Sequence, residues 1–386
     1  MHAELSQAEA QADAAAQSGR LGDARRLLEA AVRETPARLD TWLKLAAMCR
    51  GTGDLAGAMA AVGRALALDP LDLSALLMRA MLLERMGKEA EAGEAYGHAL
   101  AQRPAGDAPP PGLAAMLAHA EQRYRSFQEA MLARLRGGLA DGSASPEEQV
   151  RIDRFCTNVA RITQAFPQQP SHFHFPGLPP VEFHDRGHFL WLGELEAATA
   201  QIREEFDALI ASEAAELVPY IQYPDDVPLR QWESLNRSRD WTAVHLLQNG
   251  RRVERNARHC PRTMALLERL PQPDVPGASP NAMFSLLAPR TRIPPHTGVA
   301  NTRLVCHLPL IVPPDCGFRV GAETRRWEPG GAFVFDDTIE HEAWNDSGEL
   351  RVVFIFDVWA WALSDAERRA VAAIMPRSAA PAAEGL

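Results

Sequence analysis

The spacing of apolar residues changes along the chain from a helical period to a strand-like one. In the first third, apolar and small residues recur every three or four positions between glycines and prolines, which predicts a series of short helices. The helical period returns in three later segments, residues 113–139, 146–166 and 192–214. After Gly250 the apolar residues gather in short runs, which predict strands at residues 303–312, 331–337 and 351–359. The pattern predicts a multidomain α + β protein, helical in its first part and strand-rich in its last.

The first third also repeats itself with a period of 34 residues. Four positions recur in three copies: Gly19, Gly53 and Gly87; Ala24, Ala58 and Ala92; Ala31, Ala65 and Ala99; Pro36, Pro70 and Pro104. Each copy predicts two helices joined at the glycine, with alanines where the helices cross and a proline after the second helix. Trp42 and Leu45 add a W-x2-L opening to the middle copy. The segment resembles tetratricopeptide repeats, whose period is 34 residues; an alanine-rich helical bundle is the alternative.

Stacked repeats of this kind offer a concave groove for a peptide or a protein. With three copies, a structural brace and a dimer contact are equally compatible with the sequence. After Pro104 a Pro- and Gly-rich stretch predicts a linker, and residues 141–145 predict a break between two bridging helices. We therefore expect a repeat domain at residues 1–104, linker and bridging helices at 105–170 and a further domain at 171–386.

Composition narrows the class of protein. The formal net charge is −10, which argues against a nucleic-acid surface, because neutralising phosphates requires clustered Lys and Arg. The cysteines are odd in number and lack CxxC spacing, so neither a disulfide framework nor a zinc site is predicted. The start of the chain lacks a basic and apolar leader, and no run of about 18 apolar residues occurs, so we expect a cytoplasmic protein without a membrane segment.

Two histidines in the strand-rich part are candidates for metal binding. His296 lies in a Pro-Pro-His-Thr-Gly turn, and His341 follows the strand predicted at 331–337; Arg351 opens the next strand, ten residues later. Neutral imidazole suits Fe(II), and the commonest non-haem iron site adds a carboxylate two residues after the first histidine. Gly298 occupies that position, which leaves Asp336 and Asp337 as the nearest carboxylates, with a turn or strand-end role as their alternative. For His296 alone the alternative is a solvated loop residue.

The last part of the chain resembles the aspartyl/asparaginyl β-hydroxylases, which have two histidines and a glycine at the third position. The matching pieces are Phe284-Ser285, His296-Thr297-Gly298, Asn301, Arg303-Leu304, His307-Leu308, Glu323-Thr324-x-x-Trp327-Glu328, Phe335-Asp336-Asp337, Glu340-His341-Glu342-x-Trp344, Arg351 and Asp357-Val358-Trp359. A weaker likeness includes Phe175-Pro176-Gly177-Leu178 and Asp240-Trp241. The resemblance implies a double-stranded β-helix (jelly roll) with flanking helices over residues 171–386. Members of that family also carry tetratricopeptide repeats ahead of the oxygenase domain.

The resemblance implies a role for each matching residue. His296 and His341 would hold Fe(II), and Arg351, assisted by the Ser285 hydroxyl, would bind the distal carboxylate of 2-oxoglutarate. A guanidinium suits that task because it makes two parallel hydrogen bonds to a carboxylate. His307 would contact the C1 carboxylate of 2-oxoglutarate. Arg303, at even spacing from His307 and so on the same face of the strand, would contact the substrate or support the residues that bind it.

One departure concerns the substrate. Family members that act on aspartyl side chains commonly have Arg-Leu-Arg-x-His, the second arginine gripping the substrate acid, whereas this chain has Val305 at that place. Arg237 and Arg239 are candidates to compensate, with a solvated loop as the alternative.

The implied activity is that of an oxidoreductase, a 2-oxoglutarate-dependent dioxygenase. It would hydroxylate an aspartyl or asparaginyl residue of a protein or peptide brought by the repeats, with Fe(II) and 2-oxoglutarate as cofactor and co-substrate. Two alternatives stand beside it. One is a related hydroxylase of a lipid acyl chain or small molecule, and the other is a non-catalytic, repeat-bearing adaptor.

Overall fold

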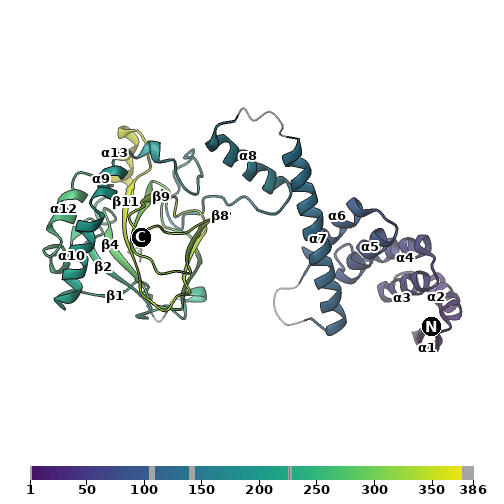
Figure 1. The fold of residues 1–386 in the computed structure, drawn as a ribbon. Coiled ribbons are helices and arrows are strands. Elements are labelled where there is room, and N and C mark those ends of the chain that lie inside the picture. The colour runs from purple at the N-terminus through teal and green to yellow at the C-terminus, as the bar shows by residue number, and fades with distance from the viewer. Residues whose placement is uncertain (1, 104–108, 139–143, 225, 227, 376–386) are drawn as a thin grey trace. The chain divides into compact units, whose positions relative to one another are not determined.

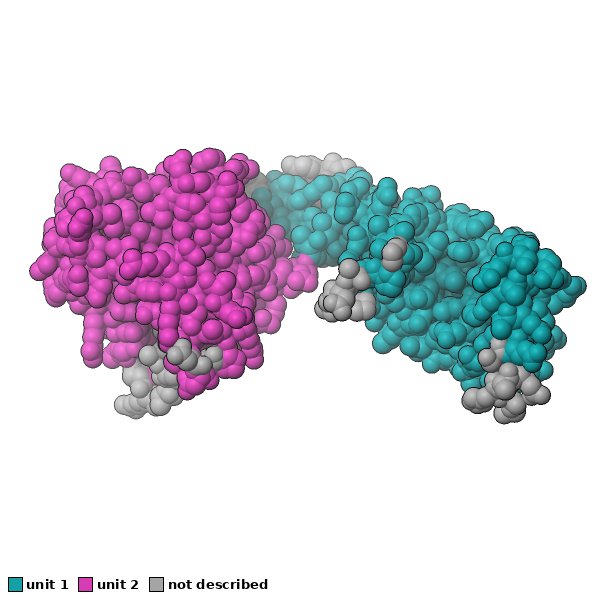
Figure 2. Space-filling model, turned by 90° about the horizontal axis from the view of Figure 1, so that it is seen from below, with its two compact units in different colours: residues 1–163 teal, residues 164–386 magenta. Residues whose placement is uncertain are grey.

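The computed structural model describes residues 2–103, 109–138, 144–224, 226 and 228–375. The chain divides into two compact units, Met1–Thr163 and Gln164–Leu386, which are coloured separately in Figure 2. The linker stretch around Pro104 and most of the break predicted at 141–145 lie outside the described residues. The helices predicted as a bridge belong to the first unit as far as Thr163.

Within residues 2–103, helices form three consecutive antiparallel pairs (Figure 1). They are α1 (His2–Gln17), α2 (Leu21–Glu34), α3 (Leu39–Gly51), α4 (Leu55–Leu68), α5 (Leu73–Arg85) and α6 (Glu89–Leu100). In each pair, the turn between the two helices contains a glycine: Gly19, Gly53 or Gly87. Their φ angles are 76°, 84° and 72°, a left-handed conformation that residues with a side chain disfavour. The recurring alanines are at most 2% exposed where the helices cross. The predicted repeat architecture is confirmed, and a glycine every 34 residues is explained by the turn that each pair requires.

Two further helices complete the first unit. The long helix α7 (Pro111–Gly137) packs Leu117 and Ala120 into the core of the third pair. Helix α8 (Pro146–Val159) begins at a capping box, in which the Ser145 hydroxyl and the Glu148 carboxylate satisfy each other's backbone N–H groups.

The second unit contains two antiparallel sheets (Figure 1). The larger has the order β1-β2-β4-β11-β6-β9, with β3 beside β2, and the smaller has the order β5-β10-β7-β8. The strands are β1 (Val218–Pro219), β2 (Trp241–Gln248), β3 (Arg251–Arg252), β4 (Ala282–Leu287), β5 (Thr291–His296), β6 (Arg303–Ile311), β7 (Cys316–Val320), β8 (Glu323–Arg325), β9 (Phe333–Phe335), β10 (His341–Asn345) and β11 (Arg351–Trp359). The predicted α + β class is confirmed.

Helices cover the outer face of the larger sheet. They include α9 (Leu192–Ala197), α10 (Thr199–Ala211), α11 (Glu254–Ala257) and α12 (Pro261–Leu267), and α13 (Asp365–Ile374) follows the last strand. One apolar core lies between these helices and the sheet, and a second lies between the two sheets. Strands β6 and β11 therefore face an apolar core on both sides, which explains their unbroken apolar runs. No helix within the described ranges is long and apolar enough to cross a bilayer.

Candidate functional site

A pocket lies between the two sheets and is lined by residues from both. Five of the six predicted site residues line it: His296, His341, Arg351, Ser285 and His307. They come from β5, β10, β11, β4 and β6 respectively, so segments separated by as much as 66 residues meet at one place. Arg303 does not line the pocket but contacts Asp337, which does.

The two histidines are neighbours across paired strands. His296 lies opposite His341 in the register of β5 and β10, and their ring centroids are 4.0 Å apart. The register slips between them and the next pair, Ile293 and Ala343, so β5 contains one extra residue there. Pro294 and Pro295 occupy the bulge, which suits them because proline has no N–H for the ladder. The bulge lets Ile293 and His296, three residues apart, both face the pocket.

Each imidazole has one nitrogen committed to the backbone. Nδ1 of His296 lies 2.8 Å from the Pro294 carbonyl, and Nδ1 of His341 lies 3.0 Å from the Ile339 carbonyl. Because a carbonyl only accepts, each Nδ1 carries the proton and each Nε2 keeps its lone pair. Burial lowers the pKa of His341 to about 4 and that of His296 well below its usual value, with the neighbouring His341 adding to the second shift. Two neutral imidazoles whose Nε2 atoms keep a lone pair are suited to bind a metal.

A carboxylate lines the same pocket as this pair, and it belongs to Asp337, one of the two candidates that the sequence offered. A Cβ added to Gly298 would lie 2.0 Å from Oδ2 of Asp337, so the Asp337 carboxylate occupies the space that a side chain at 298 would need. In the described part of the chain, no group of three or more His, Cys, Asp or Glu side chains is placed to hold a metal together. Asp336 instead accepts hydrogen bonds from Thr338 and Gln168, which is a turn-stabilising role.

This close packing predicts the effect of a small substitution. Gly298→Ala should lower the free energy of unfolding by about 2 kcal/mol, because the new methyl group overlaps the buried Asp337 carboxylate. Asp337→Gly should itself destabilise the fold, because it removes the buried ion-pair partner of Arg303, but Gly298→Ala should cost much less in that background, since the overlapping atoms are gone. Urea unfolding of the single and double variants measures this coupling. Simple additivity of the two changes would contradict it.

Arg351 is a buried cation for which the described residues supply no ion-pair partner. Its side chain is among the largest that are fully buried, and its Nε atom has no hydrogen-bond acceptor. Nη1 lies 3.4 Å from both the carbonyl oxygen and Oγ of Ser285, and the guanidinium lies 4.9 Å from the centre of the Trp327 ring. Burial lowers the pKa of Arg351 to about 10, which leaves it charged at neutral pH. A buried charge without a counter-ion is costly, so an anionic ligand would stabilise Arg351.

Two indole N–H groups orient the polar side chains beside Arg351. Trp241 Nε1 donates to Ser285 Oγ at 3.1 Å, and Trp327 Nε1 donates to His307 Nδ1 at 3.3 Å. His307 therefore carries its proton on Nε2 and can donate from that atom. Burial, and then the charge of Arg351, hold the pKa of His307 well below its usual value.

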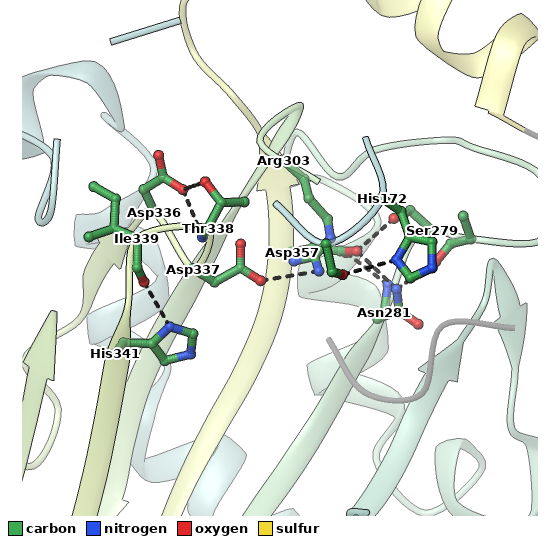
Figure 3. A network of polar contacts seen from close by, with 12 residues as sticks. His172, Ser279, Asn281, Arg303, Asp336, Asp337, Thr338, Ile339, His341 and Asp357 are labelled. Atoms are coloured by element: carbon green, nitrogen blue, oxygen red, sulfur yellow. Dashed lines mark hydrogen bonds and ion pairs between the residues drawn. The ribbon is translucent and has the colours of Figure 1, made fainter. Parts of the chain in front are cut away.

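Arg303 belongs to a buried network on the other side of Asp337 (Figure 3). Its Nη2 lies 3.2 Å from Asp337 Oδ2, and the charge of Asp357 also acts on it. Asp357 in turn accepts hydrogen bonds from Ser279 Oγ and from the backbone and side-chain nitrogens of Asn281, at 2.8 to 3.0 Å. Arg303 was predicted to contact the substrate. In the structure its partner is the carboxylate of Asp337, and the substrate contact stays a prediction.

Some features of the pocket were not singled out from the sequence. Tyr220 lines it and stacks on Trp241, with ring centroids 3.8 Å apart. Tyr220 follows the two-residue strand β1, which is too short to have a periodic signal. Arg237 and Arg239 are exposed and do not line the pocket; Arg237 donates to the Tyr223 carbonyl.

Comparison with known proteins places this pocket in a family. The aspartyl/asparaginyl β-hydroxylase family model matches residues 196–360. A human aspartyl/asparaginyl β-hydroxylase is 40% identical over 144 residues, which is 37% of this chain and 19% of the relative. An ornithine lipid ester-linked acyl 2-hydroxylase of Rhizobium tropici is 34% identical over 184 residues, 47% of this chain and 60% of the relative. The chain thus spans less than two thirds of each relative.

The helical unit has neighbours among solved structures. The TPR domain of Arabidopsis OM64 is 20% identical and covers 32% of this chain and 94% of its own length, with a TM-score of 0.28. The repeat itself rests on the helix pairs and glycine turns described above. Residues 196–360 of this chain therefore match the aspartyl/asparaginyl β-hydroxylase family, and a tetratricopeptide-like helical unit precedes them in the chain.

Proposed function

We propose that the chain is an Fe(II)- and 2-oxoglutarate-dependent dioxygenase that hydroxylates an aspartyl or asparaginyl residue of a protein or peptide. The observation that carries the proposal is the presence, in one pocket, of two neutral imidazoles and a buried arginine that has no counter-ion among the residues the structure describes. A metal ion would bind the two imidazoles, and a dicarboxylate would supply the counter-ion of the arginine. The family match supports hydroxylation as the reaction.

The residues present fit both groups. His296 and His341 would hold Fe(II) through Nε2, each oriented by the hydrogen bond at its Nδ1. Arg351 would take the distal carboxylate of 2-oxoglutarate in a two-pronged contact with Ser285 Oγ beside it, and His307 would donate to the C1 carboxylate. When bound, Fe(II) and 2-oxoglutarate supply the oxygen chemistry that releases succinate and CO2 and adds one hydroxyl group to a C–H bond.

The side chains of the pocket would orient the bound groups and shield them from water, and they would not exchange protons with the substrate. The Nδ1 hydrogen bonds and the low pKa values keep both imidazoles in the ligand form. Phe335, Ile293 and Ile355 line the same pocket and exclude water from the reacting centre. Because few protein atoms would bind the metal, positions remain for the co-substrate and for O2.

The direct test is O2-dependent conversion of 2-oxoglutarate to succinate by the full chain with Fe(II). Anaerobic addition of Fe(II) and 2-oxoglutarate should also produce a visible charge-transfer band. Both signals are expected, and both should disappear when either component is omitted. The absence of both signals, with the protein folded, would favour the alternative of a repeat-bearing adaptor without turnover.

The second candidate is hydroxylation of a lipid acyl chain. It is favoured by the Rhizobium tropici relative, an acyl 2-hydroxylase, and by the uncharged Val305 in the pocket wall. The helical unit favours the peptide instead, because stacked helix pairs present a groove suited to an extended chain. Vesicles that contain an acylated lipid, added to the succinate assay, would distinguish the two.

The lowered pKa values predict how metal binding responds to pH. A folded-state pKa below that of a free imidazole means that protons compete for the ligand nitrogens only in more acidic solution. Affinity for Mn(II), a stand-in for Fe(II), should therefore change less than about twofold between pH 8 and 5.5, whereas two imidazoles with the ordinary pKa would lose roughly 100-fold. Titration calorimetry across this range measures it, and a steep decline below pH 6.5 would count against neutral, buried ligands.

A further inference from the structure

The charged groups around the pocket restrict the charge of the substrate side chain, which the family match leaves open. Arg351 is the only arginine or lysine among the described residues that line the pocket. In the proposed function, the distal carboxylate of 2-oxoglutarate occupies it. No second cation of the lining then remains for a carboxylate on the substrate.

Another arginine close to the pocket is paired with a carboxylate of the fold. Arg303 lies two residues from Val305 on the same face of β6, but its guanidinium is buried against Asp337. The charge of Asp357 acts on it as well, so one cation is shared by two carboxyl groups. Turning it toward a substrate acid would leave Asp337 and Asp357 buried without a counter-charge, which is strongly unfavourable.

The pocket wall formed by β6 is apolar beside His307. Val305 is 3% exposed and lines the pocket, opposite Phe335 on one side and Asp357 on the other. A carboxylate placed against this wall would lose its water without gaining a partner. An uncharged group would not incur that cost.

Asp337 adds a preference of its own. Its carboxylate lines the pocket, and Oδ1 has no hydrogen-bond partner among the described residues. It would repel a second carboxylate and accept a hydrogen bond from an N–H group. A carboxamide supplies N–H donors, and an acid in its charged form does not.

We propose that, within the hydroxylase function above, this pocket takes an asparaginyl side chain in preference to an aspartyl one, and that Val305 is the specificity-determining residue. The inference rests on the proposed function. It narrows the substrate to the uncharged member of the pair.

The test uses the full chain with Fe(II), 2-oxoglutarate and O2. The substrate is a peptide library in which every random sequence occurs twice, with Asn or Asp at one fixed position. Mass spectrometry locates the added oxygen, and succinate is measured in the same reaction. We expect at least about tenfold more oxygen at Asn than at Asp, because a buried carboxylate without a counter-ion is rejected strongly.

Equal or greater oxygen incorporation at Asp overturns the inference, and so does succinate formation with oxygen only at other residues or in added acyl lipids. The second of these outcomes also contradicts the proposed function, whereas equal or greater oxygen at Asp leaves that function intact. A chain without the proposed dioxygenase activity forms no succinate under any condition.

Val305→Arg with Val305→Leu as its matched control tests the specificity residue. The arginine should shift the ratio of Asn to Asp hydroxylation toward Asp by about tenfold or more, and the leucine should leave the ratio unchanged. An unchanged ratio in folded Val305→Arg excludes Val305 as the determinant. Circular dichroism establishes folding, and if this variant does not fold, the ratio in the unsubstituted chain decides the asparaginyl preference.

Discussion

Replacement of Arg351 by alanine is expected to weaken 2-oxoglutarate binding by roughly 100-fold or more, because a buried two-pronged contact to a carboxylate is lost. Metal binding should remain, since both imidazoles keep their backbone hydrogen bonds. Anaerobic titration with Mn(II) and then 2-oxoglutarate separates the two affinities. The substitution also removes a buried cation that no described residue pairs with, so the free energy of unfolding of the metal-free protein should change little beyond the cost of the vacated space.

Arg351→Lys is the matched control. It retains the charge but not the planar fork, and should bind 2-oxoglutarate with an affinity between those of the unsubstituted chain and Arg351→Ala. If Arg351→Ala kept its affinity for 2-oxoglutarate, the counter-ion of this buried guanidinium would have to be something else, and the co-substrate would have to bind elsewhere.

Loss of either histidine should have the second large effect. His296→Ala and His341→Ala should each lower Mn(II) affinity by more than about 100-fold, because the described residues offer no third ligand side chain grouped with the pair. The double variant should then be little worse than either single one. Calorimetric titration of the three variants measures this pattern.

His245 supplies a control with similar burial. It is largely buried, burial lowers its pKa to about 4, and it does not line the pocket. His245→Ala should therefore keep the Mn(II) affinity of the unsubstituted chain, even if it costs stability. Equal loss of metal in His245→Ala and His296→Ala would indicate that misfolding, and not removal of a ligand, explains both.

The two units differ in how far sequence alone describes them. In the helical unit, the glycine and alanine positions indicate turns and helix crossings directly, because each helix packs mainly against its neighbours in the chain. The period of the sequence is therefore enough to identify the repeat. Its use as a peptide-binding groove stays a proposal, since exposed side chains have no comparable periodic constraint.

Three strands of the second unit, β6, β9 and β11, were also predicted. The apolar run of residues 351–359 became β11 without change, because a strand buried on both faces has to be apolar throughout. His296 was predicted in a turn ahead of a strand and is instead the last residue of β5. Prolines at 294 and 295 resemble a turn locally, but at an edge strand they fit a bulge.

The sequence by itself determined which elements and candidate residues are present: three helix pairs, apolar strands, and a set of residues that resembles one family of hydroxylases. What only the tertiary structure decided is which of those residues face one another. Strand pairing placed His296 opposite His341, left Arg351 buried without a counter-ion, and put the Asp337 carboxylate into the space beside Gly298. These contacts join positions tens of residues apart. They depend on sheet register and on burial, and the local spacing of residues encodes neither the register nor the burial.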